Sequence, residues 1–337
     1  MTAEDVSLTP STESPIWRGA VDWVATADGL WQPWRLLPGR AARAHAPGLI
    51  NTALMAAGVR AELRTDASAV GLRIRADEPA LPVDVLVDGE RVARLPVEPG
   101  AHEVQVPLPE GTHDVEVWLP QGGIIQVGDL VLSDAGLVEA PAPALRWTTY
   151  GSSITQAQAA YGPSETWPAL VARRLGWDLT CLGFSGQCHL DPIAARTIAA
   201  VPADVISLCL GINIQGNGSF NERSLAPQVS EFVERVREAH PDAAIAVLTP
   251  IVSPPREETP NTAGLTLEAV RSAVRAAVTE LQGEDANLHL FEGPTVIGTE
   301  DVHLLPDDLH PDGEGYRLMA DRIAPMLSRL PLPVGVR

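Results

Sequence analysis

The second half of the chain alternates two kinds of segment, and this order constrains the fold more than any other feature. Apolar runs are separated by segments of helical period; the runs are LRWTTYG, DLTCLGFSG, DVISLCLGIN, AAIAVLTP and NLHLFEG. Between Leu267 and Leu281 apolar side chains recur every three or four residues, which predicts an amphipathic helix. Near-continuous apolar strands that alternate with such helices predict a parallel sheet covered on both faces.

Local signals predict where some of these helices begin and end. Asp191 followed by Pro192 is typical of an N-cap and a first helical residue. Gly283 lies just past the Leu267–Leu281 segment, where a left-handed C-terminal cap is expected. Because ligands of parallel α/β sheets bind at the carboxyl ends of the strands, we expect the chemistry in the loops that follow the apolar runs.

The first half of the chain has a different rhythm, with short alternating runs and frequent turn residues. LPVDVLVDGERVARLPV predicts a hairpin around Asp88-Gly89, and AHEVQVPLPEGTHDVEVWLP predicts a second one around Glu110-Gly111. Such runs are typical of an antiparallel β-sandwich. Pro141 and Pro143 predict an extended linker. We therefore expect a β-sandwich domain over residues 1–140 and an α/β domain over residues 141–337.

Composition and charge limit the function classes. The 337 residues are 45% hydrophobic, enough for packed cores, and carry a formal charge of −19. Phosphate backbones and anionic lipids would repel such a chain, so we expect neither nucleic-acid nor membrane partners. The acidic N-terminus lacks the pattern of a secretory signal, and the odd set of cysteines lies in apolar surroundings: Cys181, Cys188 and Cys209. These features predict free thiols and a cytoplasmic protein.

Four loops of the second half carry the residues that acyl transfer needs. YGSSIT offers hydroxyls, CLGFSGQC a glycine N–H in a tight turn, and CLGINIQGNG an asparagine amide. LLPDDLHPDGEGY offers a carboxylate and an imidazole three residues apart. A serine becomes a competent nucleophile when a base takes its proton, and a carboxylate beside that base fixes its tautomer.

These loops resemble the motif blocks of the SGNH (GDSL-type) hydrolase family, in the same order. The matching segments are Gly151-Ser152-Ser153-Ile154, GFSG ending at Gly186, Gly211-Ile212-Asn213-Ile214 and Asp307-Asp308-Leu309-His310-Pro311. The resemblance covers about Leu145 to Leu330. It implies a three-layer, flavodoxin-like α/β domain with a five-stranded parallel sheet, and the preceding sandwich is expected to be jelly-roll-like. The matched motifs depart from the family pattern at three supporting positions, which are Ser152, Cys181 and Ile214.

The resemblance assigns a role to each matched residue. Ser153 is the predicted nucleophile, His310 the general base and Asp307 its partner. The predicted oxyanion hole comprises the backbone N–H groups of Ser153 and Gly186 and the side-chain amide of Asn213. No cofactor and no metal are expected, because His303, Asp307, Asp308 and His310 do not have the spacing of a zinc site.

Several residues have competing interpretations. Ser152 is the alternative nucleophile, although its register against Ile154-Thr155 favours Ser153. Asp308 is interpreted as a solvated loop carboxylate, His189 as a polar residue that starts a helix, and Cys188 as a structural thiol. The tryptophans of the first half, which could form a sugar-binding platform, are interpreted chiefly as core: Trp17, Trp23, Trp31 and Trp34.

The sequence thus predicts a serine-dependent ester hydrolase that acts on a small ester or an acylated sugar. An acyltransferase that moves the acyl group to an alcohol is the alternative, because the same acyl-enzyme serves both reactions. The resemblance extends to two-domain carbohydrate esterases and to acyltransferases of natural products, in which the sandwich could contact substrate. A third hypothesis is a catalytically inactive ligand-binding protein.

Overall fold

The computed structural model describes residues 4–332, which form two compact units. The first unit comprises the chain up to Pro38, Ala53–Pro143 and the short segment Gly162–Ser164. The second comprises Gly39–Thr52, Ala144–Tyr161 and the chain from Glu165 onward. The domain boundary near residue 140 stays a prediction.

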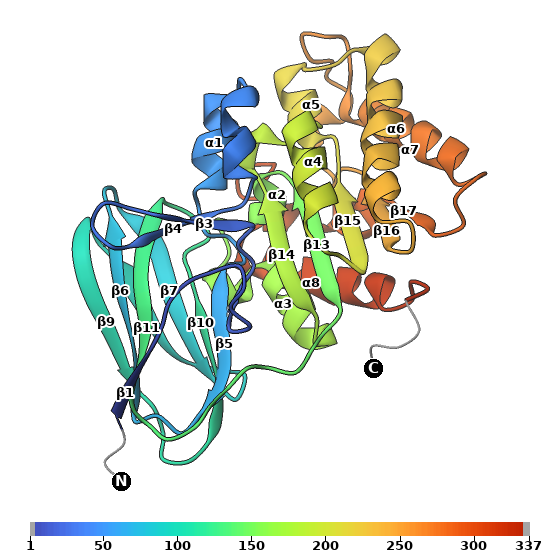
Figure 1. The fold of residues 1–337 in the computed structure, drawn as a ribbon. Helices are drawn as coiled ribbons and strands as arrows, with labels where there is room; N and C mark the ends of the chain where they lie inside the picture. The colour runs from blue at the N-terminus through green and yellow to red at the C-terminus, as the bar shows by residue number, and fades with distance from the viewer. Residues whose placement is uncertain (1–3, 333–337) are drawn as a thin grey trace. The chain divides into compact units, whose positions relative to one another are not determined.

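Two antiparallel sheets make up the first unit (Figure 1), as expected for a β-sandwich. One sheet has the order β3-β4-β11-β6-β9, with β1 also paired to β11; its strands are β1 (Glu4–Leu8), β3 (Asp22–Ala25), β4 (Trp31–Trp34), β6 (Ala69–Ala76), β9 (Gly100–Pro107) and β11 (Ile125–Ala135). The other has the order β12-β5-β10-β7-β8, with β2 paired to β5; its strands are β2 (Trp17–Arg18), β5 (Arg60–Thr65), β7 (Ala80–Val87), β8 (Glu90–Val97), β10 (His113–Trp118) and β12 (Val138–Glu139).

One of the two predicted hairpins is confirmed and the other is wrong. β7 and β8 pair across Asp88-Gly89, and both turn residues have the positive φ that a tight hairpin needs, 48° and 81°. β9 and β10, on either side of Glu110-Gly111, do not pair: β9 lies beside β6, and β10 lies between β5 and β7. The connection therefore crosses from one sheet to the other, which periodicity cannot distinguish from a hairpin.

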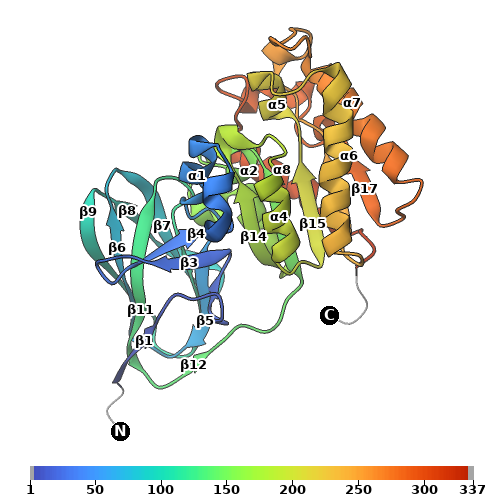
Figure 2. The ribbon, with the colours of Figure 1, turned by 45° about the horizontal axis from the view of Figure 1, so that its top comes forward.

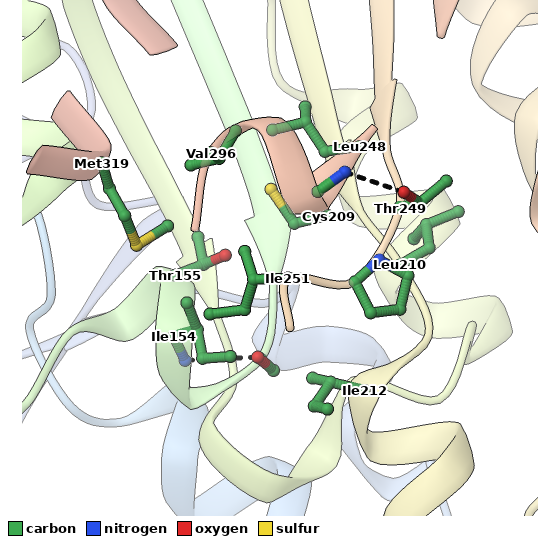
Figure 3. A pocket seen from close by; sticks show the side chains of 13 residues that line it. Ile154, Thr155, Cys209, Leu210, Ile212, Leu248, Thr249, Ile251, Val296 and Met319 are labelled. Carbon is green, nitrogen blue, oxygen red and sulfur yellow. Dashed lines mark hydrogen bonds between the residues drawn. The ribbon is translucent and has the colours of Figure 1, made fainter. Parts of the chain in front are cut away.

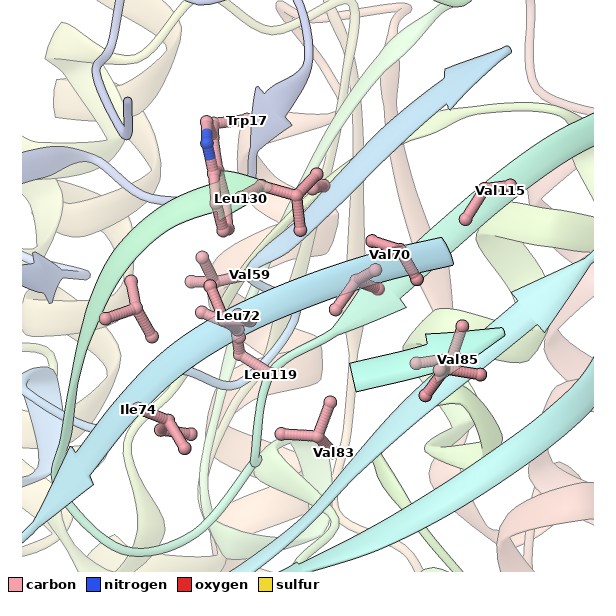
Figure 4. Close-up of a cluster of buried hydrophobic side chains, with 14 of the residues drawn as sticks. Trp17, Val59, Val70, Leu72, Ile74, Val83, Val85, Val115, Leu119 and Leu130 are labelled. Carbon is pink, nitrogen blue, oxygen red and sulfur yellow. The ribbon is translucent and has the colours of Figure 1, made fainter. Parts of the chain in front are cut away.

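The core of the first unit lies between its two sheets (Figure 4). Alternate side chains of facing strands meet there, among them Leu72 and Ile74 of β6 and Val83 and Val85 of β7. Trp17 and Trp23 are buried in this cluster with their ring centroids 5.3 Å apart, as the core interpretation predicts. Trp31 and Trp34 are half-buried, and Trp31 packs against the edge of the cluster.

A five-stranded parallel sheet in the order β14-β13-β15-β16-β17 organises the second unit, which confirms the flavodoxin-like α/β class. The strands are β13 (Arg146–Gly151), β14 (Asp178–Gly183), β15 (Val205–Cys209), β16 (Ala244–Leu248) and β17 (Leu288–Phe291). Helices α3 and α8 pack together, whereas α6 packs against both α4 and α7, and the two sets cover opposite faces of the sheet (Figures 1 and 2). The helices are α1 (Pro47–Ala53), α2 (Ser153–Gln156), α3 (Trp167–Leu175), α4 (Pro192–Ala200), α5 (Ile212–Asn217), α6 (Glu222–Ala239), α7 (Leu267–Leu281) and α8 (Gly313–Leu327).

The predicted helix from Leu267 to Leu281 is confirmed as α7, with its apolar residues Leu267, Val270, Val274 and Val278 buried. Asp191 is the N-cap of α4, although its side chain makes no capping hydrogen bond. The prediction for Gly283 is wrong. α7 ends at Gln282 in a right-handed conformation, with a φ of −61°, and Gly283 has no positive φ.

No helix within residues 4–332 combines the length and apolarity that a membrane crossing requires.

Candidate active site

The turn that carries Ser153 forms where β13 meets α2. Ser152 is the N-cap of α2, and its hydroxyl accepts a hydrogen bond of 3.2 Å from the backbone N–H of Ile154. Gly151 is required by packing, since a Cβ there would lie 2.1 Å from Thr155 Oγ1 and 3.1 Å from Cys209 Cβ. The tight turn therefore uses the hydroxyl of Ser152 for capping and leaves that of Ser153 available for another partner.

The structure brings Ser153, His310 and Asp307 together in one hydrogen-bonded chain. Ser153 Oγ lies 2.7 Å from His310 Nε2, and His310 Nδ1 lies 2.6 Å from Asp307 Oδ2. Because a carboxylate can only accept, Nδ1 carries the proton, and Nε2 accepts the hydrogen bond from the serine hydroxyl. This tautomer is the one in which an imidazole can remove the proton of Ser153.

The loop before α8 builds the carboxylate–imidazole pair locally. Asp307 Oδ1 accepts backbone hydrogen bonds from His310, at 2.7 Å, and from Leu309, at 3.1 Å. Asp308 adopts a φ of 61°, which closes the turn, and its carbonyl oxygen accepts a 2.6 Å hydrogen bond from Ser253 Oγ. The side chain of Asp308 is exposed. The three-residue spacing thus orients His310 toward Ser153 through short-range contacts.

Asp307 remains ionised in this arrangement. Burial alone would raise the pKa of its carboxyl group, but the hydrogen bonds donated by the ring and the backbone of His310 outweigh it and lower the pKa to about 2. The Asp307 side chain is 54% exposed, so solvent screens its charge, whereas the His310 side chain is 33% exposed.

Gly186 lies in the short 3₁₀-helix η3 (Ser185–Gln187) that follows β14. η3 contacts α2, and the N–H of Phe184 donates to the carbonyl of Gly151 at 2.8 Å. A Cβ at Gly186 would meet no atom within 4 Å, so this glycine faces open space. Within residues 4–332, the backbone N–H groups of Ser153 and Gly186 have no protein acceptor, which leaves both free for a ligand.

Asn213 is the second residue of α5, whose N-cap is Gly211, and the φ of 119° at Gly211 is accessible to glycine. Its Oδ1 accepts a 3.0 Å hydrogen bond from the backbone N–H of Cys188, which fixes the orientation of the amide. In the part of the chain that the structure describes, Asn213 Nδ2 has no protein acceptor. The amide is therefore held by its oxygen, and its N–H groups are available to a ligand.

An apolar pocket borders the turn that carries Ser153 (Figure 3). Ser152 and Ile154, the neighbours of Ser153, line it, as does Ile212, the neighbour of Asn213. Ile251, Val296 and Met319 complete much of its wall. The pocket holds about 410 Å³ of empty space, part of it open to solvent. The two residues next to Ser153 in the sequence therefore both contribute to this pocket.

The cysteines and the candidate metal ligands show other environments. All three cysteines are free; Cys181 and Cys188 are buried and Cys209 is half-buried. Burial raises the pKa of the Cys209 thiol to about 12 and that of Cys188 further still, so both thiols are neutral. Among residues 4–332, no three His, Cys, Asp or Glu side chains group in a way that could hold a metal ion.

His189, interpreted from the sequence as a polar residue that starts a helix, lies before the N-cap of α4, and its ring contacts the carbonyl oxygen of Gly186. No spacing rule could have found this contact, because the partner is a backbone atom three residues earlier in an irregular loop.

Comparisons with known proteins agree with this fold. The family model of the GDSL-like lipase/acylhydrolase family matches residues 149–318, and that of the SsfX3 N-terminal domain matches residues 16–126. Since the first covers half of the chain, the protein belongs to the GDSL-like lipase/acylhydrolase family. It is an enzyme that acts on ester bonds, by hydrolysis or by acyl transfer.

Individual relatives resemble the chain to different extents. The solved structure of the salicylyl-acyltransferase SsfX3, from a tetracycline biosynthetic pathway, is 32% identical, with a TM-score of 0.86 over 98% of this chain and 99% of that one. A family two carbohydrate esterase from Clostridium thermocellum, in complex with cellohexaose, shares the fold at 20% identity, with a TM-score of 0.64 over 81% of this chain and 93% of that one. A GDSL lipase of Mycobacterium tuberculosis is 27% identical over 49% of this chain and 71% of its own length.

Proposed function

We propose that the protein cleaves an ester through an acyl-Ser153 intermediate, with water as the second nucleophile and a small ester or an acylated sugar as substrate. The observation that carries this proposal is the hydrogen-bonded chain from Asp307 through His310 to Ser153, with links of 2.6 Å and 2.7 Å. Such a chain pairs a nucleophile with an oriented base.

In the first half of the proposed reaction, Ser153 Oγ attacks the ester carbonyl carbon while its proton passes to His310 Nε2. The imidazolium that forms is stabilised by the ionised Asp307, whose pKa of about 2 keeps its charge at neutral pH. The tetrahedral intermediate then breaks its bond to the alcohol oxygen, and His310 returns the proton to that leaving group.

The oxyanion of the intermediate would accept hydrogen bonds from the backbone N–H groups of Ser153 and Gly186 and from the side-chain amide of Asn213. Their freedom from protein acceptors supports this role, because donors that already point at a developing charge need no reorganisation. The apolar pocket supports an acyl group that is apolar rather than charged. In the second half, water attacks the acyl carbon, gives its proton to His310, and Ser153 regains it when the acid departs.

Transfer of the acyl group to an alcohol is the second candidate. It is favoured by the 32% identity to a salicylyl-acyltransferase over nearly the whole chain and by the match to its N-terminal domain. The acyl-enzyme would be the same, and an acceptor hydroxyl would replace water. We also propose a cytoplasmic location, which the three free thiols support.

The decisive experiment is covalent labelling with a fluorophosphonate, followed by turnover of p-nitrophenyl esters that differ in the acyl group. We expect wild type to be labelled on Ser153 and to cleave butyrate and benzoate esters faster than acetate. A folded protein that resists labelling and cleaves none of the esters would instead be a binding protein. Cleavage of acetate alone would remove the pocket from the proposal.

A further inference from the structure

The imidazole of His189 makes a hydrogen bond to each side of its ring. Its Nε2 lies 3.0 Å from the carbonyl oxygen of Gly186, and its Nδ1 lies 2.7 Å from Ser219 Oγ. The carbonyl can only accept, so Nε2 carries the proton and Nδ1 accepts from the serine hydroxyl. One neutral tautomer therefore satisfies both contacts.

The backbone around Gly186 needs such support. Ser185 and Leu190 adopt left-handed conformations, with φ values of 49° and 58°, which are unfavourable for residues with a Cβ. Gly186 has no Cβ to restrict its backbone, and a Cβ there would meet nothing within 4 Å, so no side-chain packing holds this residue. Without contacts from elsewhere, this loop would relax, and the N–H of Gly186 would lose its direction.

His189 also connects the loop of Gly186 to α5, the helix that contains Asn213. Asn217 ends α5, and Ser219, two residues later, donates its hydroxyl to His189 Nδ1. Asn217 Nδ2 donates to the carbonyl oxygen of Gly186 at 3.5 Å; it makes no hydrogen bond with the protonated Nε2 of His189, because both groups are donors. The N–H of Cys188 donates to Asn213 Oδ1 from the same loop. The loop and the helix are thus joined at both ends of α5, and His189 forms one of the two links.

We propose that His189 is a positioning residue that holds the N–H of Gly186 and the amide of Asn213 in one fixed geometry. It acts through the carbonyl of Gly186 and does not touch the reacting atoms. The inference rests on the proposed function, since it concerns the donors of the oxyanion hole. Its removal should weaken transition-state stabilisation more than substrate binding.

The test compares two variants at position 189 with a matched control. His189→Phe keeps a ring of similar size without hydrogen bonds, whereas His189→Gln places an amide N–H near the former Nε2. We expect His189→Phe to lower kcat for a p-nitrophenyl ester by about 10- to 100-fold with KM nearly unchanged. His189→Gln should recover most of that loss.

His240 provides the control, because its Nε2 also lies within hydrogen-bond distance of a backbone carbonyl, that of Ile198 at 2.8 Å, at the end of α6. His240→Phe should leave kcat near that of wild type. Affinity for phenylboronic acid, which forms a tetrahedral adduct on a catalytic serine, gives a readout that does not depend on turnover. We expect His189→Phe to weaken it by the same factor as kcat.

Three outcomes would overturn the inference: a loss carried by KM, equal activity of the Phe and Gln variants when both fold, or an equal effect of His240→Phe. A wild-type protein that neither cleaves esters nor binds the boronate rejects the proposed function itself. That failure is visible before any variant is compared.

Discussion

At Ser152 and Ser153, two adjacent hydroxyls have different partners, and this difference is testable. Ser153→Ala removes the atom that lies 2.7 Å from His310 Nε2, and we expect it to abolish fluorophosphonate labelling and to lower ester turnover by at least about a thousandfold. Ser152→Ala removes only the cap of α2 and should lower the free energy of unfolding by about 1 kcal/mol while labelling persists. Mass spectrometry of the labelled peptide and urea unfolding measure the two effects. The opposite pattern would make Ser152 the nucleophile.

Asn213 combines two roles in one amide, and a pair of variants separates them. Asn213→Ala loses both the proposed donor Nδ2 and the acceptor Oδ1, and we expect kcat to fall by about 100- to 1,000-fold. Asn213→Asp keeps an acceptor for the N–H of Cys188 but has no donor and carries a negative charge. The kcat of Asn213→Asp should be at least as low as that of Asn213→Ala, although the retained hydrogen bond from Cys188 supports the fold. An Asp variant with near-wild-type kcat would remove Asn213 from the oxyanion hole.

The ionisation of Asp307 predicts a pH dependence with a definite sign. Its pKa of about 2 lies below the ordinary value of 3.8, so the charged form favours the folded state. This contribution to stability is fully present above about pH 4 and is lost as the pH falls toward about 2. His310→Ala removes the ring donor and should raise the pKa of Asp307. The carboxyl carbon shift of Asp307, followed by NMR, reports both values; a wild-type midpoint near 3.8 would contradict the geometry.

Among the elements, β14 ends at Gly183 and the following η3 contains Gly186, and these two glycines should respond differently to alanine. A Cβ at Gly183 would lie 2.4 Å from the backbone nitrogen of Gln156 in α2, whereas one at Gly186 would face open space. Gly183→Ala should therefore lower the free energy of unfolding by about 1–3 kcal/mol or more. Gly186→Ala should leave stability nearly unchanged and reduce kcat, since the new methyl group would lie where a substrate approaches. Thermal unfolding and kinetics on both variants make the comparison, and equal stability losses would refute it.

Elements with strong periodicity could be predicted from the sequence, because their buried positions recur at a regular spacing and are occupied by apolar residues. The helix Leu267–Leu281 and the hairpin at Asp88-Gly89 are of this kind. The segment around Glu110-Gly111 was mispredicted because turn residues indicate a change of direction, not which sheet receives the next strand. The prediction of a left-handed cap at Gly283 was wrong for a related reason, since a helix can end without a left-handed residue.

The contacts of the site likewise include some that the sequence can predict and others that it cannot. Asp307 and His310 lie three residues apart, so their pairing is a local property that the sequence can predict. The approach of Ser153 to His310 joins residues 157 positions apart, and the family resemblance rather than periodicity indicated it. The contact of His189 with Gly186 depends on an irregular loop with left-handed residues at Ser185 and Leu190, and no pattern of residue types encodes it.

Across the whole molecule, both parts of the chain resemble one acyltransferase, and this likeness bears on the fate of the acyl group. The family profile of the SsfX3 N-terminal domain matches residues 16–126, and the GDSL-like profile matches residues 149–318. The triad can activate either water or an alcohol to attack the acyl-enzyme, because His310 would accept a proton from either. The distinction therefore depends on how well an acceptor is held relative to water.

Partitioning of the acyl-enzyme measures that distinction directly. With a p-nitrophenyl butyrate donor and increasing concentrations of an alcohol acceptor, a hydrolase releases free acid at a nearly constant rate, and we expect this result from the proposed function. A transferase would divert most of the acyl group to the ester product, with saturation in the acceptor that indicates a binding site. Mass spectrometry of both products in one reaction gives the ratio, and Ser153→Ala supplies the background. Saturable transfer that dominates at millimolar acceptor would replace hydrolysis with acyl transfer as the reaction of this protein.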